Sequence, residues 1–200
     1  MTETPESQVS EAQIAVHWRE EEYYEPPDAF VRQANANDPA IFDRFTEDKF
    51  PDCFKEYADL LTWDEPWHTT LDTSNPPFWK WFSGGKLNAS YNCVDRHAEA
   101  RPDKDAIIWV AEPEADEPVH ISYAELLTRV SETAALLRDF AGLRQGDRVT
   151  LHMPMVPELP ITMLACARLG IIHSQVFGGF SGHACGTRIA DSGSRVLITM

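Results

Sequence analysis

The chain has 200 residues, of which 43% are hydrophobic and 24% are charged, a composition typical of folded globular proteins and unlike that of disordered chains. Seventeen basic residues stand against 32 acidic ones, which gives a formal net charge of -15. This sign is the opposite of what attraction to nucleic-acid phosphates or to an anionic membrane requires. We therefore expect neither nucleic acid nor a membrane among its partners.

Other features of the sequence bear on where the protein works. It begins without a basic region followed by an apolar run, and no stretch reaches the roughly 18 apolar residues of a membrane span, so we expect a cytoplasmic protein. Only five basic residues are Lys, and acidic residues are spread along the chain, which suits an acidic proteome in a halophilic source. An ordinary acidic cytosolic protein is the alternative.

The four cysteines lie far apart, at Cys53, Cys93, Cys166 and Cys185. None forms a C-x-x-C pair or lies in a cluster of histidines, so neither a zinc site nor a redox motif has the required spacing. We expect reduced, buried thiols and no metal site.

The first part of the chain changes character at about residue 24. Residues 1–24 carry the run Glu20–Glu22 and few large apolar residues, so we expect an acidic flexible tail. Residues 25–88 contain short helical pieces that begin at Pro27, at Asp38–Pro39 and at Asp52, and we expect their apolar stripes to face a core. An aromatic-rich stretch follows; it suits the packing of a cap onto a larger domain better than stacking on bases, because only two lysines lie nearby. Its large aromatic residues are Trp63, Trp67, Phe78, Trp79, Trp81 and Phe82.

From about residue 89 the sequence alternates between helix and strand patterns. We expect a short helix at 90–98, paired strands at 106–110 and 119–121 across the acidic turn 112–117, and a helix introduced by the capping box Ser122-x-x-Glu125. One face of that helix carries Leu126, Leu127, Val130, Ala134, Leu137 and Phe140. Further on we expect a strand at 148–153, a helix at 157–169 stopped by Gly170, a strand at 171–177, a shorter helix and a strand at 195–199.

Strands that alternate with helices through short links predict a parallel sheet, so the fold class is α/β. The sheet is expected to expose an edge and an apolar face, which makes the architecture incomplete. Gly178 and Gly179 follow the predicted strand at 171–177. Adjacent glycines at such a place form either a tight structural turn or a backbone that a ligand approaches closely, and the pattern leaves both readings open.

Several strings resemble, in order, the AMP-forming acetyl-CoA synthetases of the adenylate-forming superfamily. They begin with the string from Trp81 to Asn88 and the string Tyr91-Asn92-Cys93-Val94-Asp95-Arg96-His97, which is similar to the acetyl, propionyl and acetoacetyl branch. They continue through Ala106–Trp109, Ile121–Leu126, Gly146–Val149, Met153–Pro160 and Met163–Gly170, and end with Phe177-Gly178-Gly179-Phe180-Ser181. The resemblance covers roughly residues 60–200.

The resemblance implies a helical N-terminal cap at 25–88, followed at 89–200 by the first part of a parallel-sheet AMP-binding large domain. It implies a ligase that uses ATP, with Mg as a cofactor, to join acetate to AMP with release of pyrophosphate, and then passes the acetyl group to CoA; propionate and acetoacetate remain alternatives. It also implies that Gly178 and Gly179 lie beside CoA, and it supplies no catalytic residue here. Asp95, Arg96 and His97 become structural residues, and we expect His152 and His173 to be packed in the core.

The sequence contains no Ser/Thr/Gly-rich phosphate loop ending near Pro-Lys-Gly. We therefore expect a chain that is the N-terminal part of the enzyme and is inactive alone, with the missing remainder as a partner; a non-catalytic CoA-binding or interaction module is the alternative. Gly182 and Gly186 depart from the family's strong helix formers. Each is expected to weaken the last helix by up to about 1 kcal/mol relative to Ala.

Overall fold

The structure, a computed structural model, describes residues 25–35, 38–112 and 116–200. The predicted tail at 1–24 lies outside the described residues, as does the middle of the predicted acidic turn, at 113–115. Contacts divide the chain into two units, Met1–Cys53 and Phe54–Met200.

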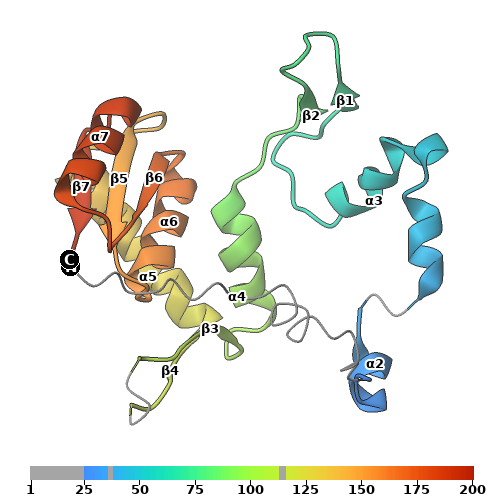
Figure 1. The fold of residues 1–200 in the computed structure, drawn as a ribbon, viewed down its shortest axis with the longest axis horizontal. Coiled ribbons are helices and arrows are strands. Elements are labelled where there is room, and N and C mark those ends of the chain that lie inside the picture. The colour runs from blue at the N-terminus through green and yellow to red at the C-terminus, as the bar shows by residue number, and fades with distance from the viewer. Residues whose placement is uncertain (1–24, 36–37, 113–115) are drawn as a thin grey trace, which may run out of the picture. The chain divides into compact units, whose positions relative to one another are not determined.

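Figure 1 shows the elements in chain order. They are α2 (Asp28–Gln33), η1 (Pro39–Arg44), η2 (Glu47–Lys49), η3 (Asp52–Phe54), α3 (Lys55–Ala58), β1 (Thr69–Asp72), β2 (Lys80–Ser83), η4 (Tyr91–Asp95), α4 (Arg96–Ala100), β3 (Asp105–Trp109), β4 (Val119–Ser122), α5 (Tyr123–Ala135), η5 (Leu136–Phe140), β5 (Arg148–Met153), α6 (Glu158–Leu169), β6 (Ile172–Phe177), α7 (Gly182–Ser192) and β7 (Val196–Thr199).

The first unit consists of short helical pieces, as predicted. Pro27 is the N-cap of α2, and the Asp38 carboxylate accepts a 2.9 Å hydrogen bond from the Ala40 N–H at the start of η1. The prediction that their apolar stripes face a core is wrong, because Phe30 is 58% and Phe42 is 78% exposed. Helical pieces of three to six residues make at most two turns, which is too short to present a continuous apolar face.

In the second unit, β1 and β2 form an antiparallel hairpin that the sequence analysis did not predict. After β2 the chain turns at Gly84, whose φ of +85° lies in the left-handed region that favours glycine. A Cβ at Gly85 would lie 2.5 Å from the Trp63 ring. The rings of Trp63 and Trp67 also pack on Phe82, with centroids 6.0 Å and 5.4 Å apart. The aromatic stretch is therefore a cluster built around the end of the hairpin.

The predicted pairing of the two strands that precede α5 is confirmed, since β3 and β4 are antiparallel. Helix α5 begins as the capping box predicts, with the Ser122 hydroxyl accepting a 3.2 Å hydrogen bond from the Glu125 N–H. The predicted burial of Phe140 is wrong, because its side chain is 87% exposed. The helix becomes a π-helix at Leu136–Phe140, which changes the angle between successive side chains, and Phe140 lines an open apolar cavity beside β7.

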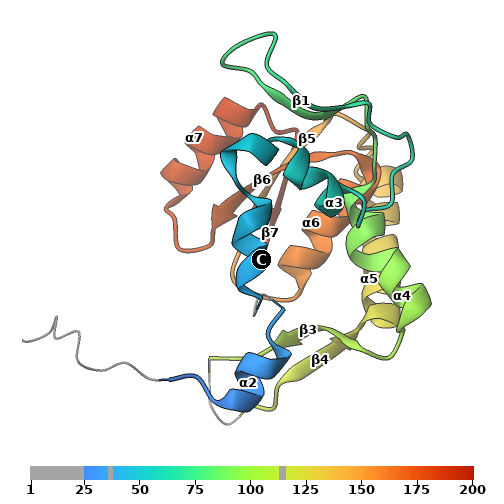
Figure 2. The same cartoon turned by 90° about the vertical axis from the view of Figure 1, so that its right-hand side faces the viewer.

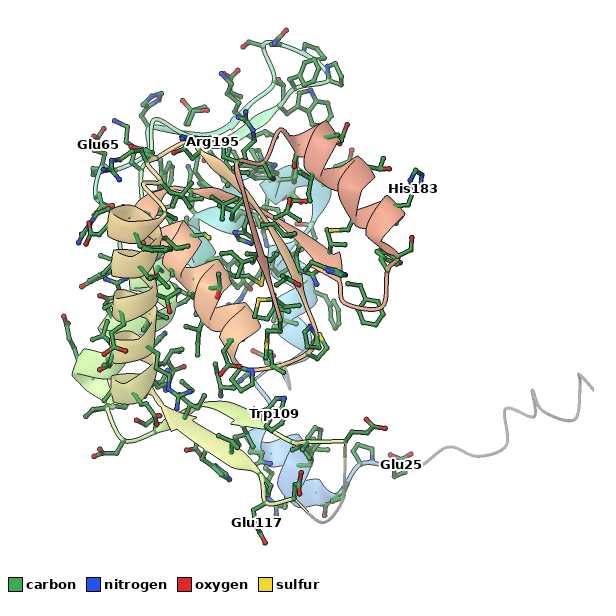
Figure 3. The ribbon with its side chains drawn as sticks, turned by 90° about the vertical axis from the view of Figure 1, so that its left-hand side faces the viewer. Glu25, Glu65, Trp109, Glu117, His183 and Arg195 are labelled. Carbon is green, nitrogen blue, oxygen red and sulfur yellow. The ribbon has the colours of Figure 1, made fainter. Side chains whose placement is uncertain are left out.

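The predicted parallel sheet is confirmed, with the strand order β6-β5-β7 and the α/β fold class. Helix α6 ends at Gly170, which has a φ of +68°. Figure 2 and Figure 3 show α5 and α6 on one face of this sheet and α7 on the other. Central strand β5 is buried on both faces: Leu151 and Thr150 are both 0% exposed, and the Thr150 hydroxyl donates a 2.8 Å hydrogen bond to that of Ser194.

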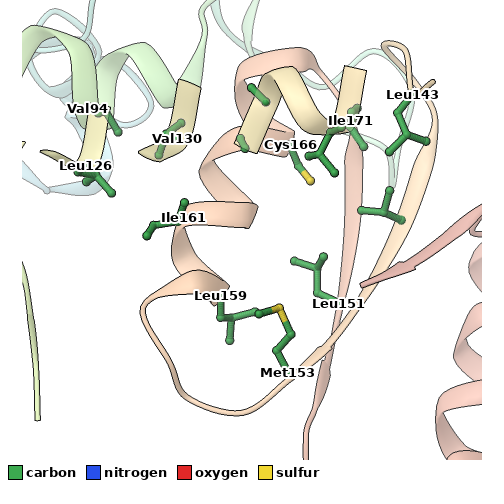
Figure 4. Close-up of a cluster of buried hydrophobic side chains, with 14 of the residues drawn as sticks. Val94, Leu126, Val130, Leu143, Leu151, Met153, Leu159, Ile161, Cys166 and Ile171 are labelled. Atoms are coloured by element: carbon green, nitrogen blue, oxygen red, sulfur yellow. The ribbon is translucent and has the colours of Figure 1, made fainter. Parts of the chain in front are cut away.

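The buried core lies between α5, α6 and the sheet. Figure 4 shows Leu159 of α6 close to Met153 at the end of β5, with Cys166 beside Ile171 at the other end of α6. Burial of a side chain such as Leu151, which is 0% exposed, stabilises the fold by roughly 1.5–3 kcal/mol. The buried members are Val94, Ile121, Leu126, Val130, Ala134, Leu137, Leu143, Val149, Leu151, Met153, Leu159, Ile161, Ala165, Cys166 and Ile171.

An open apolar cavity of about 630 Å³ lies beside β7, on the sheet face that carries α5 and α6. Leu136, Phe140, Val196 and Ile198 are among its lining residues. It agrees with the expectation that an apolar face of the sheet is uncovered. Among the described residues, no helix is long and apolar enough to cross a membrane.

Candidate functional site

The carboxyl ends of the three parallel strands lie at one edge of the sheet. In register, Met153 of β5 pairs with Phe177 of β6, and His152 of β5 pairs with Thr199 of β7. Ligands of open α/β sheets bind at this edge, because the loops that follow the strands gather there. The structure therefore places the predicted glycines, Gly178 and Gly179, directly after the end of β6, at the carboxyl edge of the sheet.

Gly178 packs closely against the protein's own backbone. A Cβ at this position would lie 3.1 Å from the carbonyl carbon of Met153 and 3.1 Å from the nitrogen of Pro154. Both atoms belong to the chain leaving β5, so any side chain would push apart the turns after β5 and β6. The structural reading of this glycine is thus supported, and it allows the two turns to approach each other closely.

Gly179 has a different environment, because it is exposed. Its Cβ position would be 2.8 Å from the Phe177 ring, and the turn is closed by a 3.0 Å hydrogen bond from the Phe180 N–H to the Phe177 carbonyl. The Phe177 and Phe180 rings meet edge to face, with centroids 6.0 Å apart. Bare backbone at Gly179, flanked by two aromatic rings, offers a surface for close contact with a flat or extended ligand.

The string Tyr91–His97 forms a junction rather than a catalytic site. The Asn92 amide donates a 2.9 Å hydrogen bond to the Thr62 carbonyl, and its oxygen accepts one of 2.8 Å from the Thr62 N–H. Arg96 donates a 2.7 Å hydrogen bond to the Leu60 carbonyl. Asn92 is 8% exposed. These contacts attach the segment after α3 to the start of the domain that carries the sheet.

The same junction reaches the end of α6. The Asp95 carboxylate pairs with the Arg168 guanidinium at 2.5 Å, with side chains 18% and 26% exposed respectively. The Asn88 amide donates a 3.0 Å hydrogen bond to the Arg168 carbonyl, which lies in the last turn of α6. These contacts are consistent with the predicted structural role of Asp95 and Arg96, because both join segments distant in sequence.

His97 also lies in a structural environment. Its Nδ1 is 3.1 Å from an Arg101 guanidinium nitrogen, and its ring packs on Tyr123 with centroids 5.1 Å apart. Partial burial, followed by the charges of Arg101, Arg96 and Lys104, lowers the pKa of His97 below its ordinary value. The His97 ring therefore packs at the junction beside three cationic side chains.

The two strand histidines, His152 and His173, were predicted to be packed in the core, and the structure shows both to be only partly buried. Burial lowers the pKa of His173. The Nε2 of His152 is buried without a hydrogen-bond partner among the described residues. The prediction of buried thiols holds for Cys166 and Cys185. Cys53 is only partly buried, and the prediction is wrong for Cys93, which lies in η4 and is exposed.

Among the described residues, no group of three or more His, Cys, Asp or Glu side chains is arranged to hold a metal ion. Sequence reasoning located the glycine turn from its place after a strand. It missed Met153, Pro154 and Arg188 around that turn, since no local pattern connects them with the glycines.

Comparison with known proteins matches the chain to two family profiles. Residues 40–93 match the sequence profile of the family described as "Acetyl-coenzyme A synthetase N-terminus". Residues 94–200, more than half of the chain, match the profile described as "AMP-binding enzyme".

Curated relatives are similar over most of the chain. An acetyl-coenzyme A synthetase from Mycobacterium bovis is 47% identical over 177 residues, which are 88% of this chain and 27% of that protein. One from Pyrobaculum aerophilum is 44% identical over 189 residues, 91% of this chain and 26% of that protein. One from Streptomyces coelicolor is 44% identical over 192 residues, 96% of this chain and 29% of that protein.

The chain thus spans little more than a quarter of the length of these relatives, since the matched residues make up 26% to 29% of each of them. The matched profiles join at residue 93, within the junction whose hydrogen bonds are described above. The fold, the junction and both profiles lead to one assignment: the chain belongs to the family of AMP-binding enzymes, and within it resembles the N-terminal portion of the AMP-forming acetyl-CoA synthetases.

Proposed function

We propose that the protein is an acetate–CoA ligase. In this reaction a carboxylate oxygen of acetate attacks the α-phosphorus of ATP and releases pyrophosphate, and the thiol of CoA then attacks the carbonyl carbon of acetyl-AMP and releases AMP. The observation that carries the proposal is 47% identity over 177 residues to an acetyl-coenzyme A synthetase. As the substrate we propose acetate rather than propionate or acetoacetate, because each of the relatives described above is named an acetyl-coenzyme A synthetase.

We propose that Gly178 and Gly179 form the CoA side of the site. Gly178 lets the turns after β5 and β6 approach, and exposed Gly179 presents backbone beside the rings of Phe177 and Phe180. Support comes from their position at the carboxyl edge of a parallel sheet. No catalytic residue is assigned among residues 1–200.

The adenylation step is proposed to depend on residues other than these. The 200 residues contain no Ser/Thr/Gly-rich loop of the kind that cradles ATP phosphates. Mg is proposed to act together with ATP. We assign no residue in the part of the chain that the structure describes as its ligand. Residues 1–200 alone are therefore expected to be inactive in adenylation.

We propose the following organisation: an acidic tail at 1–24, a cap at 25–88 and the first part of the large domain at 89–200. A cytoplasmic location in a halophilic source is proposed from the formal charge of -15 and the five lysines among 17 basic residues. Since screening reduces repulsion among excess acidic groups, raising the salt concentration should stabilise the protein against urea.

Pyrophosphate exchange tests the function. The product of the complete gene is expected to incorporate labelled pyrophosphate into ATP when acetate is present, more efficiently than with propionate or acetoacetate. Purified residues 1–200 should show no acetate-dependent exchange. Acetate-dependent exchange by residues 1–200 alone would contradict the proposal that adenylation depends on other residues. If the complete gene product shows no exchange with acetate, propionate or acetoacetate, the proposed activity is wrong.

A further inference from the structure

Arg188, in the second half of α7, lies against the glycine turn. Its guanidinium carbon is 4.7 Å from the centroid of the Phe180 ring. Its Nη1 donates a 3.0 Å hydrogen bond to the Ala184 carbonyl, one turn earlier in the same helix. Because α7 begins immediately after Ser181, the helix brings this cation back over the turn from which it starts.

The two aromatic rings of the turn are not fixed by burial. Phe177 is 56% and Phe180 is 44% exposed. The rings contact each other edge to face at 6.0 Å, and Phe180 is bonded through its N–H to the Phe177 carbonyl. Their positions therefore depend on each other and on the cation over the face of Phe180.

The position of Phe177 in turn sets the space at Gly179. The Phe177 ring is 2.8 Å from where a Cβ of Gly179 would be, so movement of this ring changes what can approach that glycine. A continuous series of contacts thus leads from Arg188 through Phe180 and Phe177 to Gly179. The other glycine, Gly178, is fixed independently by the backbone at Met153 and Pro154.

We propose that Arg188 is a positioning residue for the glycine turn. It holds the face of Phe180, and through the two rings it keeps Gly179 in the conformation that accepts a ligand. The identity of that ligand, CoA, rests on the proposed function, whereas the conformational role does not. The contact requires a positive charge, so Lys at this position should replace Arg in part and Gln should not.

Amide hydrogen exchange of Phe180 tests the positioning role, because this N–H closes the turn. Arg188→Gln should raise its exchange rate about two- to fivefold, the range that an exposed cation–π contact supports, and Arg188→Lys should restore most of the protection. Phe180→Leu should have a similar effect to Arg188→Gln. In the double variant this amide should exchange no faster than in Phe180→Leu alone, since each single change already removes the same contact between Arg188 and the Phe180 ring.

The matched control is Arg138→Gln, which makes the same charge change on η5 in an exposed pair with Asp139. It should leave exchange at Phe180 unchanged. The midpoint of global unfolding in urea should move little in every variant, which separates local opening from loss of fold. Unchanged exchange in Arg188→Gln would overturn the inference.

Calorimetric titration of the complete gene product with CoA tests the consequence for binding. Arg188→Gln and Phe180→Leu should weaken CoA binding by similar factors, and their effects should not add. If Arg188→Gln weakens CoA binding and Phe180→Leu does not, Arg188 acts through its charge alone and the positioning role is wrong. If the unsubstituted protein binds no CoA while exchange changes as expected, the proposed function fails and the positioning role stands.

Discussion

Asp95, the last residue of η4, and Arg168, in the last turn of α6, form a 2.5 Å ion pair. The two residues are 73 positions apart in the sequence. Each belongs to a different string that resembles the acetyl-CoA synthetases, and the ion pair joins these two strings in the folded chain. One string supplies the carboxylate, and the other supplies the cation at a helix C-terminus, where positive charge is favourable.

Loss of this pair should destabilise the protein. Arg168→Met leaves Asp95 poorly solvated and without its cation, so we expect unfolding in urea to require about 1–3 kcal/mol less free energy. Asp95→Asn should lower the free energy of unfolding less than Arg168→Met does, since it leaves no uncompensated carboxylate. A double-mutant cycle measures the coupling. The matched control is Arg138→Met, whose ion pair with Asp139 has side chains 54% and 63% exposed and should matter little. Equal losses at Arg168 and Arg138 would contradict the structural role of the junction.

Two glycine-to-alanine changes should have opposite effects on stability. Gly178→Ala places a methyl group 3.1 Å from backbone atoms of Met153 and Pro154, which should destabilise the protein by about 1–3 kcal/mol. Gly186→Ala meets no atom within 4 Å and replaces a glycine inside α7, so it should stabilise by up to about 1 kcal/mol. Urea unfolding of both variants provides the comparison. Stabilisation by Gly178→Ala would show that the turns after β5 and β6 are not packed as described.

His97 should make stability depend on pH. Its pKa is lowered in the folded protein by partial burial and by the charges of Arg101, Arg96 and Lys104, so the unfolded chain binds the proton more readily. The stability associated with neutral His97 is present above the ordinary pKa of 6.5 and is lost as the pH falls through the lowered folded value. The unfolding midpoint in urea, measured at about pH 7.5 and about pH 5.5, should fall more for the unsubstituted protein than for His97→Gln.

The control for this measurement is His183→Gln. Figure 3 shows His183 directed away from the sheet on the outer side of α7, and its side chain is exposed. This variant should show the same dependence on pH as the unsubstituted protein. If His97→Gln also leaves the dependence unchanged, the cations around His97 do not act on it as described.

The cysteines should react with a thiol reagent in a defined order. Cys93 is exposed and should be labelled first, whereas burial of Cys166 raises the pKa of its thiol to about 11 and should delay labelling until the protein unfolds. Mass spectrometry of peptides after timed labelling at about pH 8 identifies the order. Cys93→Ser should remove the fast phase; labelling of Cys166 as fast as that of Cys93 would mean that α6 does not pack as described.

The sheet was predictable from the sequence because its signals are local. Strand patterns in β5 and β6 alternate with a helix stopped at Gly170, and short links leave parallel pairing as the simple arrangement. The β1–β2 hairpin was missed because each strand has four residues and the connection contains Pro76–Pro77 rather than a short hairpin turn signal. Phe140 was misplaced because a π-helical turn is not visible in helical spacing.

The candidate site was predictable only in part. The position of Gly178 and Gly179 after a strand indicated a turn at the ligand edge, and the structure confirms the place of the turn. The atoms that a side chain at Gly178 would crowd belong to Met153 and Pro154, which become neighbours only through the pairing of β5 with β6. Spacing along the chain carries no information about such contacts, so the environment of the turn needed the structure.

The central claim is that this chain supplies the CoA side of an acetate–CoA ligase, and Gly179→Val in the complete gene product tests it most directly. Acetate-dependent exchange of pyrophosphate into ATP requires no CoA, whereas formation of acetyl-CoA does. We predict that the variant, compared with Gly186→Ala, raises the KM for CoA and lowers acetyl-CoA formation far more than pyrophosphate exchange. Equal loss of both activities, or unchanged acetyl-CoA formation, would contradict the claim.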